Sequence, residues 1–144
     1  MPTRITNFLH DSKVAPGSPP TLGTGFDTAD VHLHDMTGDL PSFKGAGLYQ
    51  GIVDLIHVTL TSAGTPTTVT IRLCLDANGD QTIVPDTTAT LVAGITTAAT
   101  KCAAFAVDQT IFQQNAGTNR NLYLFAKVDS GTAVFAESVI TWRE

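Results

Sequence analysis

The stretch TTVTIRLCLDANGDQTIV, residues 67–84, decides the fold class of this chain. In its first half, Val69, Ile71 and Leu73 alternate with threonine and arginine, and this period of two predicts a strand with one buried face. The Asn78-Gly79 pair that follows tolerates the positive φ angles of a type I′ turn, so the chain is predicted to turn back and pair as a hairpin. The stretch therefore indicates an antiparallel sheet.

Short runs of the same kind recur on both sides of this hairpin, with turn residues between them. The predicted strands are residues 52–61, 67–75, 81–84, 88–93, 101–107, 122–128 and 134–142. Pro85-Asp86 is predicted to be a turn, and residues 95–106 are the one segment where a short helix competes with a loop followed by a strand. Many short strands with regular turn signals are typical of sandwiches and barrels. The prediction is an all-β fold, an antiparallel β-sandwich of about seven or eight strands.

Residues 1–46 differ from the rest, because they contain five of the seven prolines and show no sustained periodicity. The segment VAPGSPP, residues 14–20, fits neither a helix nor a central strand. Apolar residues nevertheless recur through the region. We expect residues 1–46 to form an extended N-terminal arm, which lies on its own domain or on a neighbouring subunit, and residues 47–144 to form the sandwich domain.

Composition narrows the classes of function. Charged residues make up only 15% of the chain, threonine occurs 23 times, and the net charge is −5. The eight basic residues are scattered, whereas nucleic-acid binding requires clustered Lys and Arg, so no nucleic-acid partner is expected. No apolar run approaches the roughly 18 residues of a membrane helix, and the first residues contain no apolar signal region. A neutral, threonine-rich surface is typical of a rigid shell component or an extracellular module.

Cys74 and Cys102 lie 28 residues apart, each within a predicted strand. This spacing matches neither a metal finger nor a Cys-x-x-Cys motif. We expect two buried free thiols, and a disulfide between neighbouring strands is the alternative.

Two groups of residues are weak candidates for metal ligands. The first is Asp76, Asn78 and Asp80, which match the oxygen positions that open a calcium loop, although the glycine and the final glutamate of that motif are missing. A polar hairpin turn is the simpler interpretation. The second is His32 and His34, which would point to one face of a strand but need at least one further ligand. Their simpler interpretation is two polar residues on the outer side of the arm.

The sequence contains no arrangement that indicates catalysis. No Gly-x-Ser-x-Gly motif occurs, the only glutamates are Glu137 and Glu144, and no glycine-rich loop opens a helix. Tyr123 and Phe125 share one face of their strand. That face would form a platform for a sugar or a protein if it is exposed, and would be core if it is buried. We expect no enzymatic activity and no cofactor.

A Pro- and Gly-rich N-terminal segment thus precedes a threonine-rich, charge-poor β domain that ends in FAESVITWRE, residues 135–144. In these features the whole chain resembles a small structural protein of a tailed phage or related virus, in particular a capsid decoration (cement) protein of the jelly-roll kind. The resemblance implies homotrimers on the outer capsid surface, arms that reach the major capsid protein, and assembly in the host cytoplasm, where thiols stay reduced. The residues expected to anchor the arm to its partner are Ile5, Phe8, Leu9, Leu22 and Phe26.

Two other functions compete with this one. A carbohydrate- or receptor-binding module of a tail fibre or an extracellular protein would require exposed, clustered aromatic residues. A metal-dependent enzyme of the cupin kind would require His32, His34 and a third ligand to converge inside a barrel.

Overall fold

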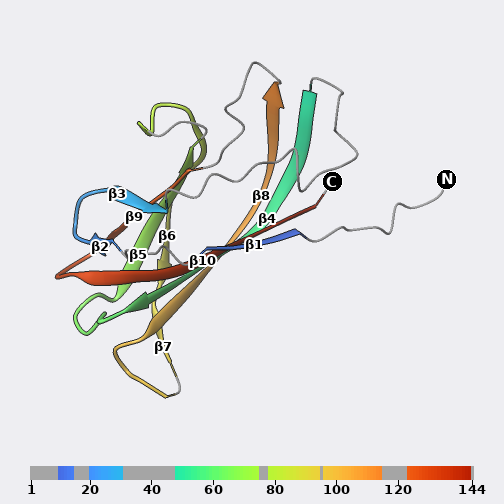
Figure 1. The fold of residues 1–144 in the computed structure, drawn as a ribbon. Helices are drawn as coiled ribbons and strands as arrows, with labels where there is room; N and C mark the ends of the chain where they lie inside the picture. The colour runs from blue at the N-terminus through green and yellow to red at the C-terminus, as the bar shows by residue number, and fades with distance from the viewer. Residues whose placement is uncertain are drawn as a thin grey trace.

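The computed structural model describes residues 10–14, 20–30, 48–74, 78–94, 96–114 and 123–143. This part of the chain contains ten strands and no helix (Figure 1). The strands are β1 (His10–Val14), β2 (Thr21–Leu22), β3 (Asp27–Asp30), β4 (Leu48–Thr61), β5 (Thr68–Cys74), β6 (Thr82–Thr90), β7 (Val92–Ala93), β8 (Lys101–Gln114), β9 (Tyr123–Val128) and β10 (Ala133–Arg143). The predicted all-β class is confirmed.

The strands form two antiparallel sheets. One has the order β1-β10-β4-β8-β7, with β2 also pairing with β10, and the other has the order β3-β9-β5-β6. If the two-residue strands β2 and β7 are set aside, the first strand pairs with the last, the second with the seventh, the third with the sixth and the fourth with the fifth. Such nested pairing is the strand order of a jelly roll. The predicted jelly-roll-like sandwich is therefore confirmed.

The core lies between the two sheets. On β5 the alternation predicted from the sequence holds, because Val69, Ile71 and Leu73 are fully buried while Thr68 and Thr70 are only partly covered. The largest side chains that are fully buried are Phe135, Leu22, Ile56, Leu60, Ile71 and Leu73. Burial of apolar side chains such as these is the main favourable term in folding.

The β5–β6 hairpin is confirmed, but its connection is longer than a two-residue turn. Cys74 pairs with Thr82, so residues 75–81 join the strands, and Gly79 within this connection has a φ of 81°. A glycine suits this position because a side chain at positive φ is strained.

One predicted boundary is wrong and another is confirmed. Pro85-Asp86 is not a turn but part of β6, where a register shift opposite Arg72 accommodates the extra residue. Proline is tolerated there because β6 is an edge strand and needs no hydrogen bond on its outer side. Residues 96–100 form a bend and a turn, with Thr100 N donating to Thr97 O at 3.1 Å, and β8 begins directly afterwards at Lys101. The predicted loop followed by a strand is therefore confirmed there, and the competing short helix is not present.

The N-terminal region also differs from the prediction. β1 pairs with β10 and β3 pairs with β9, so the described ranges of residues 1–46 are strands of the sandwich and not a separate arm. The chain between these strands is held as well, because Phe135 N donates to Pro20 O and Val128 N donates to Gly23 O, both at 2.9 Å. Of the two places that the sequence left open for this region, its own domain or a neighbouring subunit, the described ranges lie on their own domain.

Candidate interaction surface

The structure places only some of the residues that the sequence singled out. Leu22 is in the core, Phe26 lies on the outer side of the four-stranded sheet, and Asn78 and Asp80 are exposed in the β5–β6 connection. The remaining candidates, which lie outside the described residues, are Ile5, Phe8, Leu9, His32, His34 and Asp76. Within the described ranges, no three His, Cys, Asp or Glu side chains gather in a group that could hold a metal ion.

Leu22 does not fit its predicted role as a contact to a partner. Its exposed fraction is 0%, and it packs in the main core of its own chain. A side chain without exposed area cannot reach another protein unless this core opens. The correction follows from the pairing of β2 with β10, which carries Leu22 in between the sheets.

Phe26 anchors the chain to its own sheet. Its ring packs on a small cluster formed by Cys74, Tyr123 and Phe125 on the outer side of β5 and β9. Arg72 and Lys127 lie over the same ring, at 4.4 Å and 4.5 Å from its centroid. Cations at this distance from an aromatic face are attracted by its quadrupole. Phe26 thus joins the segment before β3 to the four-stranded sheet.

The same contacts settle the question of the aromatic platform. Tyr123 and Phe125 are only 8% and 9% exposed, because Phe26 and the turn around Gly79 cover them. The structure therefore supports the second interpretation from the sequence, in which Tyr123 and Phe125 are buried core residues. A flat, solvent-facing pair of rings for a sugar is not present at these positions.

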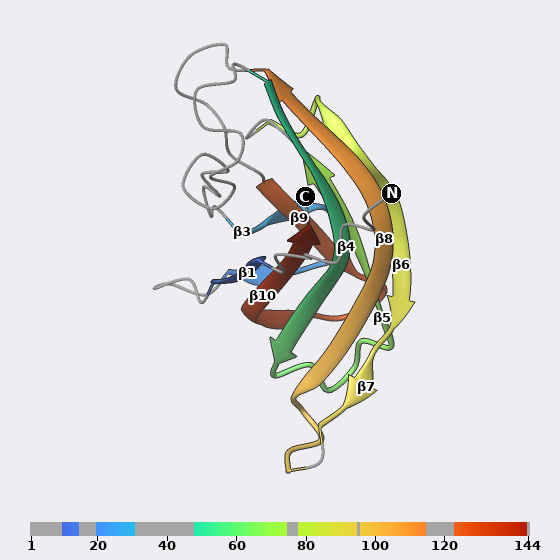
Figure 2. The same ribbon diagram turned by 90° about the vertical axis from the view of Figure 1, so that its right-hand side faces the viewer.

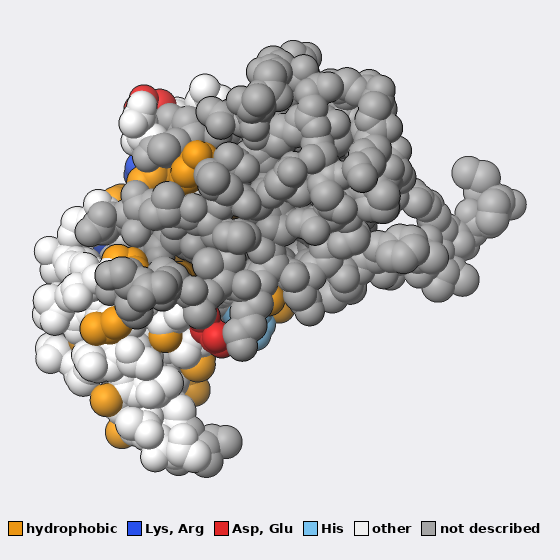
Figure 3. Space-filling model, in the orientation of Figure 1, with side chains coloured by type: hydrophobic (Ala, Val, Ile, Leu, Met, Phe, Trp, Pro, Cys, Tyr) orange, Lys and Arg blue, Asp and Glu red, His pale blue; other side chains and the backbone are white. Residues whose placement is uncertain are grey.

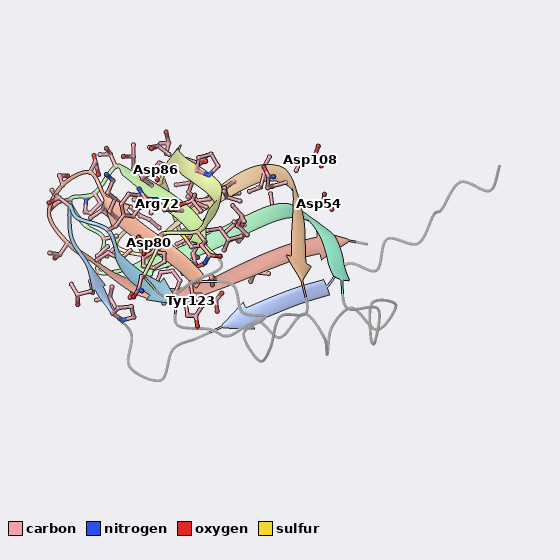
Figure 4. All side chains as sticks on the ribbon, turned by 90° about the horizontal axis from the view of Figure 1, so that it is seen from above. Asp54, Arg72, Asp80, Asp86, Asp108 and Tyr123 are labelled. Carbon is pink, nitrogen blue, oxygen red and sulfur yellow. The ribbon has the colours of Figure 1, made fainter. Side chains whose placement is uncertain are left out.

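Arg72 and Asp86 form an ion pair across the irregular part of β6 (Figure 4). Arg72 Nε donates to Asp86 Oδ1 at 2.6 Å, and Nη2 donates to Oδ2 at 3.1 Å. This hydrogen bonding lowers the pKa of Asp86 and raises that of Arg72. Both side chains are substantially exposed, at 30% and 46%, so solvent screens the pair and its contribution to stability is small.

The two cysteines occupy different environments. Cys74 is buried, but Cys102 is exposed, so the prediction of two buried thiols is wrong for Cys102. Both are free thiols, because Cys74 lies on the outer side of the four-stranded sheet and Cys102 lies on the outer side of the six-stranded sheet. Cys102 faces outward from the six-stranded sheet, where its Sγ lies 3.8 Å from Thr59 Oγ1.

Cys102 belongs to an open groove of about 430 Å³. The groove lies where β8 runs past the end of β7 and alongside β6, which also contacts β8 (Figure 2). Its lining includes His57, Ala89, Thr90, Val92, Cys102 and Ala104. Val92 is 67% exposed and is the one large hydrophobic side chain in the described ranges that is so exposed.

The lining of this groove is largely uncharged. His57 is the only ionisable side chain of its lining apart from the Cys102 thiol, and the other lining residues are small, apolar or hydroxyl-bearing. Figure 3 shows the same neutral character on the described surface of one side of the molecule, where charged side chains are few. A neutral surface of small side chains lets another backbone approach closely.

No family model matches this chain, and no curated protein matches it. In the part of the chain that the structure describes, no helix has the length and hydropathy that a membrane span requires.

Sequence reasoning missed the groove. The groove exists because β7 ends after pairing with two residues of β8, and this end point is set by the order of strands in the sheet. The signal that could have pointed to it is the run Ala103-Ala104-Phe105-Ala106-Val107, which places small side chains on the outer face of a strand and carries no charge.

Asp129 lies in the turn between β9 and β10 and binds the segment that enters β5. Its carboxylate accepts hydrogen bonds from Thr67 N at 2.9 Å, Thr67 Oγ1 at 2.6 Å and Thr68 N at 3.1 Å. These bonds lower the pKa of Asp129 from 3.8 to about 2. The ionised carboxylate is therefore the form that the folded state favours.

This lowered pKa predicts a pH dependence of stability. Since the folded pKa lies below the unfolded one, the contribution of Asp129 is complete above about pH 4 and is lost as the pH falls through about 2. An Asp129→Asn variant should melt below the wild type at neutral pH, and the difference should shrink as the pH falls towards 2. Thermal melts of both proteins across this range measure it. A difference that is the same at every pH would contradict a role for the ionised carboxylate.

Proposed function

We propose that this chain is a structural virion protein that decorates the outer surface of a capsid and stabilises the shell. The observation that carries the proposal is the jelly-roll strand order, which viral capsid domains share with lectin domains and cupins. The neutral, threonine-rich surface also supports it, because such a surface fits a shell component better than a protein that handles charged ligands.

One observation favours this proposal over the carbohydrate-binding alternative. The carbohydrate-binding alternative needs exposed aromatic rings, but Tyr123 and Phe125 are buried. The cupin-like alternative rests on His32 and His34, which lie outside the described residues. We propose a non-catalytic protein, and metal analysis of the purified chain would test the cupin-like alternative.

The fold narrows the part of the chain that we propose to bind the capsid. Leu22 and Phe26 pack on their own domain. Of the five proposed anchors, Ile5, Phe8 and Leu9 remain, and all three precede β1, which begins at His10. An extended segment with several apolar side chains can gain backbone hydrogen bonds and pocket contacts together on a neighbouring protein. Assembly as a trimer would multiply these modest contacts into avidity.

Cosedimentation with capsids of the virus that encodes the chain tests the proposal. The full chain should pellet with capsids in a saturable manner. A deletion of residues 1–9 leaves β1 in place, so it should keep the melting temperature and lose most of the capsid binding. If the full chain does not bind capsids, the decoration role is wrong. If it binds a glycan array instead, the receptor-binding alternative takes its place.

A further inference from the structure

The outer edges of the two sheets differ in how they are protected against pairing with another strand. Natural proteins guard such edges with charged residues, proline or bulges. β1 contains Asp11 and Lys13, β3 contains Asp27 and Asp30, and β6 contains the irregular step at Pro85. Each of these three edge strands therefore carries a feature that discourages pairing.

β8 lacks such a guard over five residues. β7 pairs only with Lys101 and Cys102, and no other described strand pairs with β8 on that side, although β6 of the other sheet contacts β8. The sequence beyond this point is Ala-Ala-Phe-Ala-Val at positions 103–107, without charge or proline. Asp108, whose φ of 46° breaks the extended backbone, ends this open edge. Residues 103–107 are called the open edge below.

The direction of the backbone groups follows from one hydrogen bond. Gly94 N donates to Thr100 O at 2.6 Å, so the carbonyl of Thr100 faces the side of β7. In an antiparallel sheet, alternate residues direct both of their backbone groups to the same side. The pairing of β8 with β4 is regular from Lys101 to Ala106, so Ala104 and Ala106 direct their N–H and C=O groups to the open edge.

We propose that the open edge pairs with the same edge of a second copy of this chain, in antiparallel orientation about a two-fold axis at Phe105. In this register Ala104 lies opposite Ala106 of the second copy, and Ala106 lies opposite its Ala104. These are the residues whose backbone groups face outward, so each pair can exchange two N–H···O bonds. The register thereby satisfies every backbone group that the open edge presents.

The side chains fit this pairing on both faces. Ala104 and Ala106 are exposed, and their methyl groups leave room for a close approach on the outer face. Phe105 is 2% exposed and points into the core, so the pairing does not require it to move. The groove beside the open edge, with the exposed side chain of Val92, would be covered by the second copy.

Charge favours a second copy in antiparallel orientation. Lys101 lies at one end of the open edge and Asp108 lies at the other. Lys101 Nζ donates to the neutral carbonyl oxygens of Gly64 and Pro66, which leave its positive charge in place. Antiparallel pairing brings the Lys101 end of each copy near the Asp108 end of the other, whereas parallel pairing would bring like charges together. A two-fold contact also needs only one self-matching surface. The inference does not depend on capsid binding, and this two-fold contact is a different interface from the one that would hold the proposed trimer.

Paired substitutions at the exposed alanines test the proposed register. Ala104→Lys with Ala106→Lys would place like charges directly opposite each other across the axis. Ala104→Lys with Ala106→Glu would place opposite charges there instead. The particle mass and the association constant of the full chain are measured by sedimentation over a range of concentrations. The wild type should associate. The association constant of the Lys/Lys variant should be lower by about tenfold or by a larger factor, and the Lys/Glu variant should recover most of the association.

Thr96→Lys with Ala98→Lys is the matched control. It adds the same charge as the Lys/Lys variant, at exposed positions of the turn before β8, and should associate as the wild type does. Thermal melts establish that each variant is folded, which is expected because all four side chains are exposed. The proposal is overturned if the wild type does not gain mass with concentration, if the Lys/Lys variant associates like the wild type, or if the Lys/Glu variant is no better than the Lys/Lys variant.

Discussion

A chain that lacks residues 1–30 should give no cooperative unfolding transition. The deletion removes β1, β2 and β3, and with them Leu22 from the main core. Loss of Leu22 alone forfeits about 1.5–3 kcal/mol of apolar burial. Loss of β1 and β3 also leaves β10 and β9 without a paired neighbour on one side. Small domains are stable by only about 5–15 kcal/mol, so these losses together should leave little ordered structure.

Circular dichroism and thermal or urea melts of the truncated chain measure this effect. Deletion of residues 1–9 is the control, since it keeps all three strands and should melt as the full chain does. A cooperative transition in the chain without residues 1–30, at a midpoint near that of the full chain, would show that the first three strands are dispensable. The region would then be an arm, as its composition suggested.

Phe135→Ala should lower the free energy of unfolding by about 3–5 kcal/mol, the usual cost of removing a buried aromatic ring. Phe135 is 0% exposed and is the largest fully buried side chain among the described residues. It lies on β10, the strand that pairs with β1, β2 and β4. The cavity left by the ring would therefore lie beside β10, which joins β1, β2 and β4 in the six-stranded sheet.

Urea unfolding of the wild type and two variants checks this value. Phe135→Leu keeps much of the apolar volume and should cost clearly less. Val134→Ala changes the preceding residue, which is half-buried, and should cost about 1 kcal/mol or less. Equal losses in Phe135→Ala and Val134→Ala would contradict the placement of this ring at the centre of the core.

The sequence predicts the strands from β4 onward better than the short strands near the N-terminus. β5, with its alternating Val69 and Ile71, could be identified because one face is buried and the other is polar. β1 and β3 could not, because they are only five and four residues long and lie in a segment rich in proline and glycine. Their position is decided by partners more than 90 residues away, at the other end of the chain.

A candidate site could be predicted from the sequence only where its residues lie in one continuous segment. Phe26 was predicted to contact a partner, whereas the contacts that the structure shows are with its own sheet, through Arg72, Lys127 and the Tyr123 cluster. The groove at Cys102 combines residues from β4, β6, β7 and β8. No local pattern specifies such a combination, because it requires both the sheet order and the point at which β7 ends.

The position of β10 has a consequence for how the protein is made. This strand is synthesised after the other nine described strands, yet it lies between β1 and β4 in the six-stranded sheet. During translation β1 therefore has no partner until residues 138–142 have left the ribosome, and β4 can pair only with β8. Folds dominated by such long-range pairing complete slowly, because the entropy of closing long loops must be overcome before the contacts form. The nascent chain must thus hold β1 unpaired while the residues between Val14 and Ser138 are made.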